Sequence, residues 1–119
     1  MDMDLAGACE LCLSLPHVEE TLPFGPDTLV FKVAGKVFAL TAPEEYPPRL
    51  NLKCDPPKAL GLREKYEGIT PGWHMNKKHW NTILLDGSVP SIVVQELVRH
   101  SYGLVVAGLP GVKRRELGL

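Results

Sequence analysis

The sequence lacks the long apolar run that a membrane span requires, and it contains few cysteines. No apolar stretch approaches the roughly 18–20 residues that cross a bilayer. The first residues, Met-Asp-Met-Asp, do not follow the basic and then apolar order of a secretory signal. Three cysteines are an odd number, which fits a reducing compartment better than a disulfide scaffold. We therefore expect a cytoplasmic protein without membrane association.

Signatures of catalysis and of cofactor binding are also missing. The glycines at 103, 108 and 111 have neither the spacing nor the strand-to-helix context of a phosphate loop. His74 and His79 are five residues apart, a spacing that suits neither one face of a helix nor one face of a strand. A metal carrier or an enzyme would depend on these histidines and on Cys9 and Cys12 alone. We expect no catalytic residue, no cofactor and no metal site.

Cys9 and Cys12 match the C-x-x-C pattern, but they fall within an expected helix rather than at its N-terminus. A redox dithiol is typically found at a helix N-terminus, where the helix dipole lowers the thiol pKa. We therefore expect both cysteines to face the core as small apolar residues. His100 and Ser101 also lie in mid-helix without a nucleophile elbow, and we expect Ser101 to be a small residue where the last helix meets the sheet.

Composition predicts one folded domain over residues 1–119, since 45% of the residues are hydrophobic and 23% are charged. The charge is unevenly distributed along the chain. Residues 1–48 hold two basic and eight acidic side chains, whereas residues 49–119 hold eleven basic and six acidic ones. Folding either brings the basic half to one surface or mixes both halves, and both outcomes stay open.

Periodicity and turn residues predict the order α-βββ-α-ββ-α. Asp4 is a candidate cap for a helix over residues 5–15, and Glu19 and Glu20 are expected in a solvated loop. Strands are expected at 28–33 and 36–41, joined by a hairpin turn at Ala34-Gly35, and at 49–54, where residues of alternating polarity indicate a third strand. Asp55 opens a second helix that extends to about residue 66. Short strands follow near 69–73 and 80–85, then a helix that ends before a basic tail at 109–119. We expect an α+β fold, a two-layer sandwich with an antiparallel sheet covered on one face by helices.

Residues 71–87 concentrate side chains that stack, donate hydrogen bonds and carry charge, including both tryptophans. Lysines neutralise phosphates, asparagine and histidine donate to phosphates or base edges, and an indole stacks on a base. The pattern suggests a β-hairpin with a basic tip, of the kind that enters a groove, and we interpret Trp80 as a core anchor. The candidate nucleic-acid-binding residues are Lys53, His74, Asn76, Lys77, Lys78 and Arg99.

The run PGWHMNKKHWNT at residues 71–82 resembles the hallmark segment of the MmcQ/YjbR family of small bacterial proteins. Segments at 15–16, 23–25, 31–39, 52–56 and 101–105 resemble other parts of that family in the same order, although Gly103 stands where an acidic residue is common. The resemblance covers about residues 10–117. It implies a small fold described as CyaY-like or secretion-chaperone-like, and DNA binding through a proposed double-wing motif. It implies no catalytic residues.

Two functions follow as expectations. The first is a non-enzymatic nucleic-acid-binding protein that contacts phosphates through the basic hairpin surface, with DNA as the partner. The alternative is a protein- or peptide-binding module that uses an apolar sheet face or helix groove. The sequence leaves the oligomeric state open.

Overall fold

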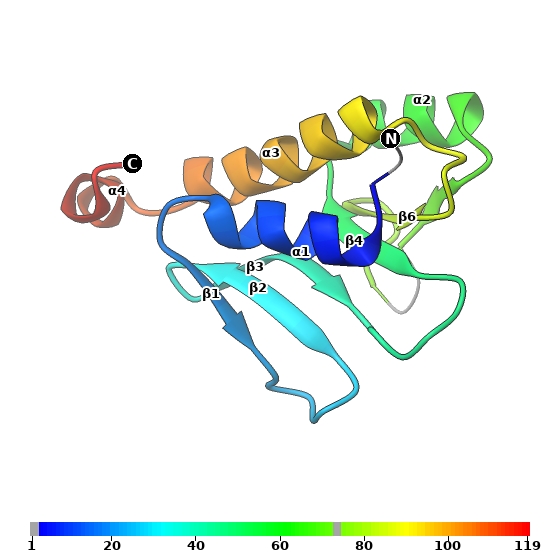
Figure 1. Cartoon of the computed structure of the whole chain (residues 1–119). Coiled ribbons are helices and arrows are strands. Elements are labelled where there is room, and N and C mark those ends of the chain that lie inside the picture. The colour runs from blue at the N-terminus through cyan, green and yellow to red at the C-terminus, as the bar shows by residue number, and fades with distance from the viewer. Residues whose placement is uncertain (1–2, 73–74) are drawn as a thin grey trace.

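The computed structural model describes residues 3–72 and 75–119, and it forms two layers: a six-stranded sheet and a layer of helices on one face of that sheet (Figure 1). The helices are α1 (Leu5–Ser14), α2 (Pro56–Lys65), α3 (Ser91–Ala107) and α4 (Gly111–Leu117). The strands are β1 (Val18–Thr21), β2 (Leu29–Val33), β3 (Lys36–Thr41), β4 (Arg49–Lys53), β5 (Ile69–Pro71) and β6 (Trp80–Leu84). The expected α+β fold with an antiparallel sheet is confirmed.

The strand order is β1-β2-β3-β4-β6-β5, and each neighbouring pair is antiparallel. β2 and β3 form the expected hairpin. Its turn residues Ala34 and Gly35 have φ values of 50° and 78°, and two successive positive values are what a two-residue type I′ turn requires. The first helix begins as predicted, because the Asp4 carboxylate accepts a hydrogen bond from the Gly7 amide at 2.8 Å. Asp55 precedes α2 without a side-chain capping bond.

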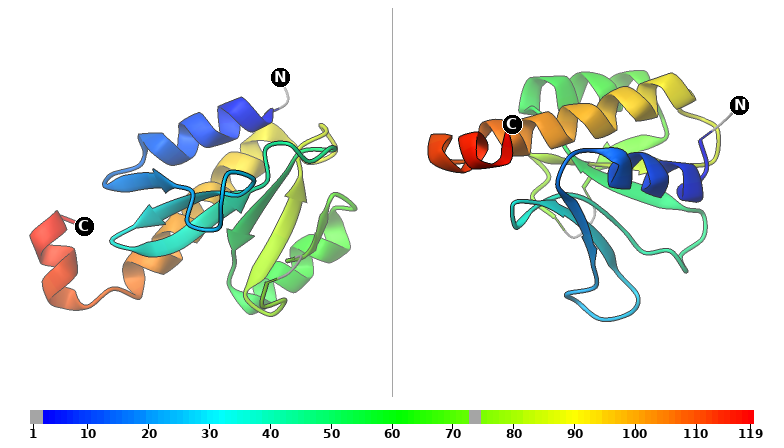
Figure 2. Two further views of the ribbon diagram at one scale, coloured as in Figure 1. Left: turned by 90° about the horizontal axis from the view of Figure 1, so that it is seen from below. Right: turned by 60° about the vertical axis from the view of Figure 1, so that its left-hand side comes forward.

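Alternation along the strands separates a helix-covered face from an open face. On β4, Leu50 and Leu52 are buried toward the helices, while Arg49, Asn51 and Lys53 are half-buried on the other side. Successive side chains of a strand point to opposite faces, so one residue settles the orientation of its neighbours. α3 packs on β2, β3 and β4, α1 on β1 and β4, and α2 on β5. Figure 2 (left) looks onto the open face, with α3 behind the sheet.

Ser101 of α3 lies where two strands diverge. β3 and β4 pair through only two residues of each strand. The Ser101 hydroxyl accepts a hydrogen bond from the Lys53 amide at 2.9 Å and donates one to the Phe38 carbonyl at 2.5 Å. This fully buried serine therefore satisfies two backbone groups that the strands no longer pair, in agreement with its expected place between helix and sheet.

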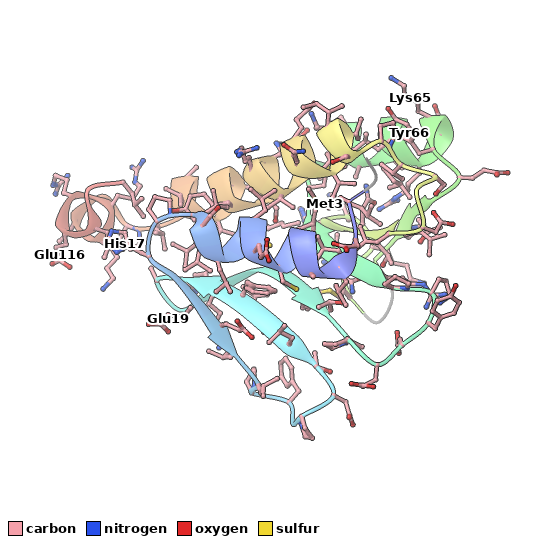
Figure 3. The ribbon with its side chains drawn as sticks, viewed as in Figure 1. Met3, His17, Glu19, Lys65, Tyr66 and Glu116 are labelled. Carbon is pink, nitrogen blue, oxygen red and sulfur yellow. The ribbon has the colours of Figure 1, made fainter. Side chains whose placement is uncertain are left out.

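Two elements differ from the expected order. Residues 18–21, expected to be a loop with solvated glutamates, form the edge strand β1, which pairs only with β2. Charged side chains are common on edge strands because they oppose further strand pairing. The expected basic tail contains α4, which the His17 ring contacts through a 2.7 Å hydrogen bond to the Leu117 carbonyl (Figure 3). None of the described helices is long and apolar enough to cross a membrane.

Candidate functional site

A row of side chains crosses the open face from one sheet edge to the other. Its members are consecutive Cα partners in the register of the six strands: Thr21, Val30, Leu40, Asn51, Thr82 and Thr70. We call this set the central row. The Thr82 hydroxyl donates to the Asn51 side-chain carbonyl at 2.6 Å, and the Asn51 amide donates to the Leu40 backbone carbonyl at 3.4 Å. The middle of the row is thus polar and fixed by hydrogen bonds.

Two adjoining cavities lie over the central row. The first has a volume of about 440 Å³ and the second about 350 Å³, and both are lined in part by Arg49 and Thr82. The first is completed by Pro47, Glu67, Gly68, Thr70, Pro71, Lys77 and Leu84. The second is completed by Phe24, Thr28, Leu40, Ala42, Glu45, Asn51 and Met75. We call the pair of cavities the trough, and volumes of this size are typical of small-molecule sites.

The walls of the trough are loops. The β1–β2 and β3–β4 connections extend away from the helices, as Figure 1 shows, and they contribute Phe24 and Glu45. The described part of the β5–β6 connection contributes Met75 and Lys77. The trough is therefore enclosed by three connections that are distant in sequence.

Arg49 and Glu45 form an ion pair at the junction of the two cavities. The shortest distance between guanidinium and carboxylate is 3.9 Å, and the side chains are 31% and 57% exposed. Such an exposed pair contributes about 0–1 kcal/mol. Both residues line the smaller cavity.

A second row on the open face is cationic. Lys32 and Val37 are Cα partners on β2 and β3, and Lys53 and Trp80 are partners on β4 and β6. All four are half-buried. We call this set the cationic row. It lies two residues from the central row along β2, β4 and β6, about 7 Å away, and three residues along β3, where the register shifts. Its β2–β3 half and its β4–β6 half are separated by the gap where β3 and β4 diverge. The exposed Lys77 and Lys78 lie in the turn before Trp80, and Lys77 lines the first cavity.

Trp80 was expected to anchor the core, and this expectation is wrong. The residue shares its face with Thr82 and Leu84, whereas Asn81 and Ile83 point toward the helices. The core position next to Trp80 is occupied by Asn81, an amide that is 2% exposed. The indole is thus half-buried on the open face beside Lys53.

The predicted candidate residues only partly converge. Lys53 and Lys77 lie on the open face. Lys78 is exposed in the same turn, where the Asn76 side chain accepts a hydrogen bond from the Lys78 amide at 3.0 Å. Arg99 does not join them: α3 turns its buried residues toward the sheet, and Arg99 is exposed on the outer side of that helix. His74 lies outside the described residues. Lys32 and Arg49 belong to the open face and were not identified from the sequence.

Arg63 of α2 was also not identified, although it holds the turn that contains Lys77. Its Nε donates to the Asn81 side-chain carbonyl at 2.7 Å, and its Nη2 donates to the backbone carbonyls of Lys77 and, at 3.3 Å, of Trp80. These contacts join residues 14 to 18 positions apart. The sequence holds no local signal for them, because an arginine in a helix is usually solvated.

The cysteines and histidines form no reactive cluster in the described part of the chain. Cys12 is fully buried, and burial, with a smaller effect of Cys9, raises the pKa of its thiol to about 12. Burial and the nearby Glu20 also raise the pKa of the Cys9 thiol. Raised values oppose thiolate formation, so the pair is a poor redox site. Among residues 3–72 and 75–119, no three potential ligands gather around a metal position.

Comparison with known proteins identifies relatives. A model of the YjbR family matches residues 13–104. YbdF of Escherichia coli O157:H7 is 43% identical over 102 residues, which cover 86% of this chain and 84% of that protein. YjbR of Escherichia coli K12 is 33% identical over 115 residues, covering 97% and 98%.

Solved structures agree with the sequence matches. The crystal structure of Deinococcus radiodurans protein DR2400, with a DUF419 domain, has a TM-score of 0.92 and 44% identity. The match covers all of this chain and 90% of that one. A protein from Pseudomonas syringae has a TM-score of 0.74 and 28% identity, covering 86% and 98%.

Proposed function

This chain belongs to the YjbR family, and we propose that it is a non-enzymatic protein that binds single-stranded nucleic acid on the open face of its sheet. The observation that carries the proposal is the pairing of Lys53 with Trp80 on one exposed face. A cation and an aromatic ring side by side are the two components of a single-strand site, since one neutralises a phosphate and the other stacks on a base.

Further lysines lie near Lys53 and Trp80, at the same end of their strands. Lys32 of β2 lies on the same face, and Lys77 and Lys78 continue it at the turn before β6. Positive charge along a groove gives affinity that does not depend on sequence, because each phosphate contact releases counterions. The cationic row then supplies the backbone contacts, and the trough lies next to it for the bases.

The shape of the face favours a single strand over a duplex. The β1–β2 and β3–β4 connections project on this side of the sheet (Figure 1), and Met75 and Lys77 line the trough from a third connection. These loops would hold a duplex away from the sheet, whereas an extended single strand of nucleic acid reaches the central row. Bases of a single strand are also unpaired and free to stack.

A fluorescence anisotropy titration tests the proposal. The probes are a labelled oligothymidine of about 20 nucleotides and a duplex of equal length, at about 50 mM and about 200 mM salt. We expect tighter binding of the single strand. The Lys53→Gln/Lys78→Gln variant should reduce the slope of log K against log salt by about 1.4, that is, about 0.7 for each lost phosphate contact.

The matched control removes the same charge from the helix layer, through Arg99→Gln and Lys113→Gln, both of which are exposed. This control should bind as the wild type does. The proposal fails if neither probe binds at the lower salt, or if the two double variants lose affinity equally.

A protein or peptide partner is the second candidate, and exposed aromatic residues on the rim favour it. Phe24 and Tyr46 are 74% and 91% exposed on the loops beside the trough, and aromatic side chains are typical anchors of protein interfaces. Selection from a random peptide library tests this function. Peptides retained by the wild type but not by Thr70→Trp, which fills the larger cavity, would support it; an equal yield would exclude the trough as their site.

A further inference from the structure

We propose that the smaller cavity of the trough, beside Arg49 and Glu45, binds a guanine base of the strand. This inference rests on the proposed single-strand function and adds a base preference to it. The proposal is based on two side chains that line a cavity of about 350 Å³. Arg49, which only donates hydrogen bonds, lies 3.9 Å from Glu45, whose carboxylate only accepts them.

The cavity offers both the polar and the apolar contacts that a base requires. Arg49 and Glu45 lie four residues apart, at the start of β4 and in the loop before it. Phe24 and Met75 contribute apolar lining from two other loops. A planar base is held by stacking on such side chains and by hydrogen bonds to its edges.

Guanine matches this pair because its neighbouring edges differ in hydrogen-bonding character. N7 and O6 are both acceptors, and an arginine donates to them through two parallel hydrogen bonds. The adjacent N1–H and N2–H₂ groups are donors, which a glutamate carboxylate accepts. Arg49 and Glu45 side by side therefore fit two adjoining edges of one base, and the ion pair between them is kept.

The other bases fit less well. Adenine places the N6 amino donor next to N7, so that an N–H of Arg49 would face a donor. Thymine and cytosine have no N7 acceptor, and they lose the second bond to the guanidinium. A site with a fixed donor and acceptor rejects a base that leaves these groups unpaired.

The cavity is also within reach of the cationic row. Arg49, Asn51 and Lys53 lie on one face of β4, and Arg49 and Lys53 are about 13 Å apart along the strand. A phosphate at Lys53 therefore places a neighbouring nucleotide of the same strand near the cavity. For this reason the proposed ligand of the cavity is a guanine base within a nucleic-acid strand rather than a free nucleotide.

The test compares oligothymidines of about 12 nucleotides that carry a central dT, dG or dA, by fluorescence anisotropy at fixed salt. We expect the dG probe to bind about 5- to 100-fold more tightly than the dT and dA probes. Glu45→Gln and Arg49→Lys should each remove most of this preference, measured for each variant as the ratio of its dG affinity to its dT affinity. Arg99→Gln, on the outer side of α3, is the matched control and should keep the preference.

Each other outcome has a defined meaning. Equal binding of all three probes overturns the guanine site and leaves the single-strand function standing. A dG preference that survives both Glu45→Gln and Arg49→Lys also overturns it. If no oligonucleotide binds, both proposals fail; a separate titration with 5′-GMP and 5′-AMP, followed by tryptophan fluorescence, then shows whether the cavity takes a free guanine nucleotide instead.

Discussion

Arg63 and Asn81 are joined by a 2.7 Å hydrogen bond that connects α2 to the strand behind the cationic turn. Asn81 is 2% exposed, and its amide also donates to the Ala59 carbonyl of α2 at 3.4 Å. The same guanidinium donates to the backbone carbonyls of Lys77 and Trp80. The covered side of the sheet therefore fixes the position of the turn that carries Lys77 and Lys78.

Replacement of Arg63 tests this connection. Arg63→Ala leaves the buried Asn81 carbonyl without its charged donor, and we expect a loss of about 1–3 kcal/mol in the free energy of unfolding. Urea denaturation measures the loss, and hydrogen exchange at residues 75–80 should accelerate. Lys65→Ala, two residues away and exposed, is the control. Equal stability and exchange in the two variants would contradict the role of Arg63.

Ser101→Ala tests the bridge between the diverging strands. The substitution leaves the part-buried Lys53 amide and the fully buried Phe38 carbonyl without the serine hydroxyl as partner. We expect the free energy of unfolding to fall by about 2–4 kcal/mol, since each buried unpaired group costs about 1–3 kcal/mol. Ser14→Ala removes an exposed serine that donates only to the Leu11 carbonyl and should cost far less. A loss below 1 kcal/mol for Ser101→Ala would show that water or another group replaces the hydroxyl.

Two glycines form a matched pair for close packing beside Trp80. A Cβ atom at Gly72 would lie 2.6 Å from the Trp80 Cβ and 3.0 Å from its carbonyl oxygen, whereas a Cβ at Gly103 meets nothing within 4 Å. We expect Gly72→Ala to destabilise the protein by about 1–3 kcal/mol and to shift its tryptophan fluorescence. Gly103→Ala, in the middle of α3, should stabilise it by about 0.5–1 kcal/mol. Thermal unfolding of both variants measures the difference, and a reversed order would contradict the packing.

His100 makes stability depend on pH. Burial lowers the pKa of its ring below the ordinary value of 6.5 and Lys58 lowers it further, while Asp55 and Glu96 act in the opposite direction. Its Nε2 accepts a hydrogen bond from the Asp55 amide at 3.3 Å, which requires a neutral ring at that nitrogen. The unfolded chain therefore binds a proton first as the pH falls.

The stability that neutral His100 contributes is complete above pH 6.5, the ordinary pKa of the ring. It is lost as the pH falls from there toward the lower pKa of the folded state. Urea unfolding at about pH 7.5 and about pH 5.5 measures this loss. His100→Gln, which keeps an acceptor but does not titrate, should lose less stability than the wild type over this interval. Equal losses would show that His100 does not titrate differently in the folded and unfolded states.

Local signals predicted the fold well. The Ala34–Gly35 turn, the Asp4 cap and the alternation in β4 each depend on neighbours in the chain, and the structure confirms each of them. The resemblance to the family is confirmed as well. β1 was missed because two glutamates in a short edge strand look like a solvated loop, and only its pairing with β2 defines it.

The site was harder to predict, because its geometry depends on contacts between distant segments. Trp80 was assigned to the wrong face, since an apolar strand does not show which of its two faces the helices cover. The sequence pointed to the turn at Lys77 and Lys78, but the clamp by Arg63 and the trough arise from α2 and from three separate loops. Such contacts leave no local pattern.

The most direct test of the open face as the binding surface is a ¹H–¹⁵N chemical-shift map of the ¹⁵N-labelled protein titrated with unlabelled oligothymidine of about 12 nucleotides. We predict that the largest shifts fall on Lys32, Lys53, Lys78, Trp80 and Thr82, while the outer side of α3 around Arg99 stays unchanged. Shifts centred on the helix layer, or no shifts at low salt, would contradict the account.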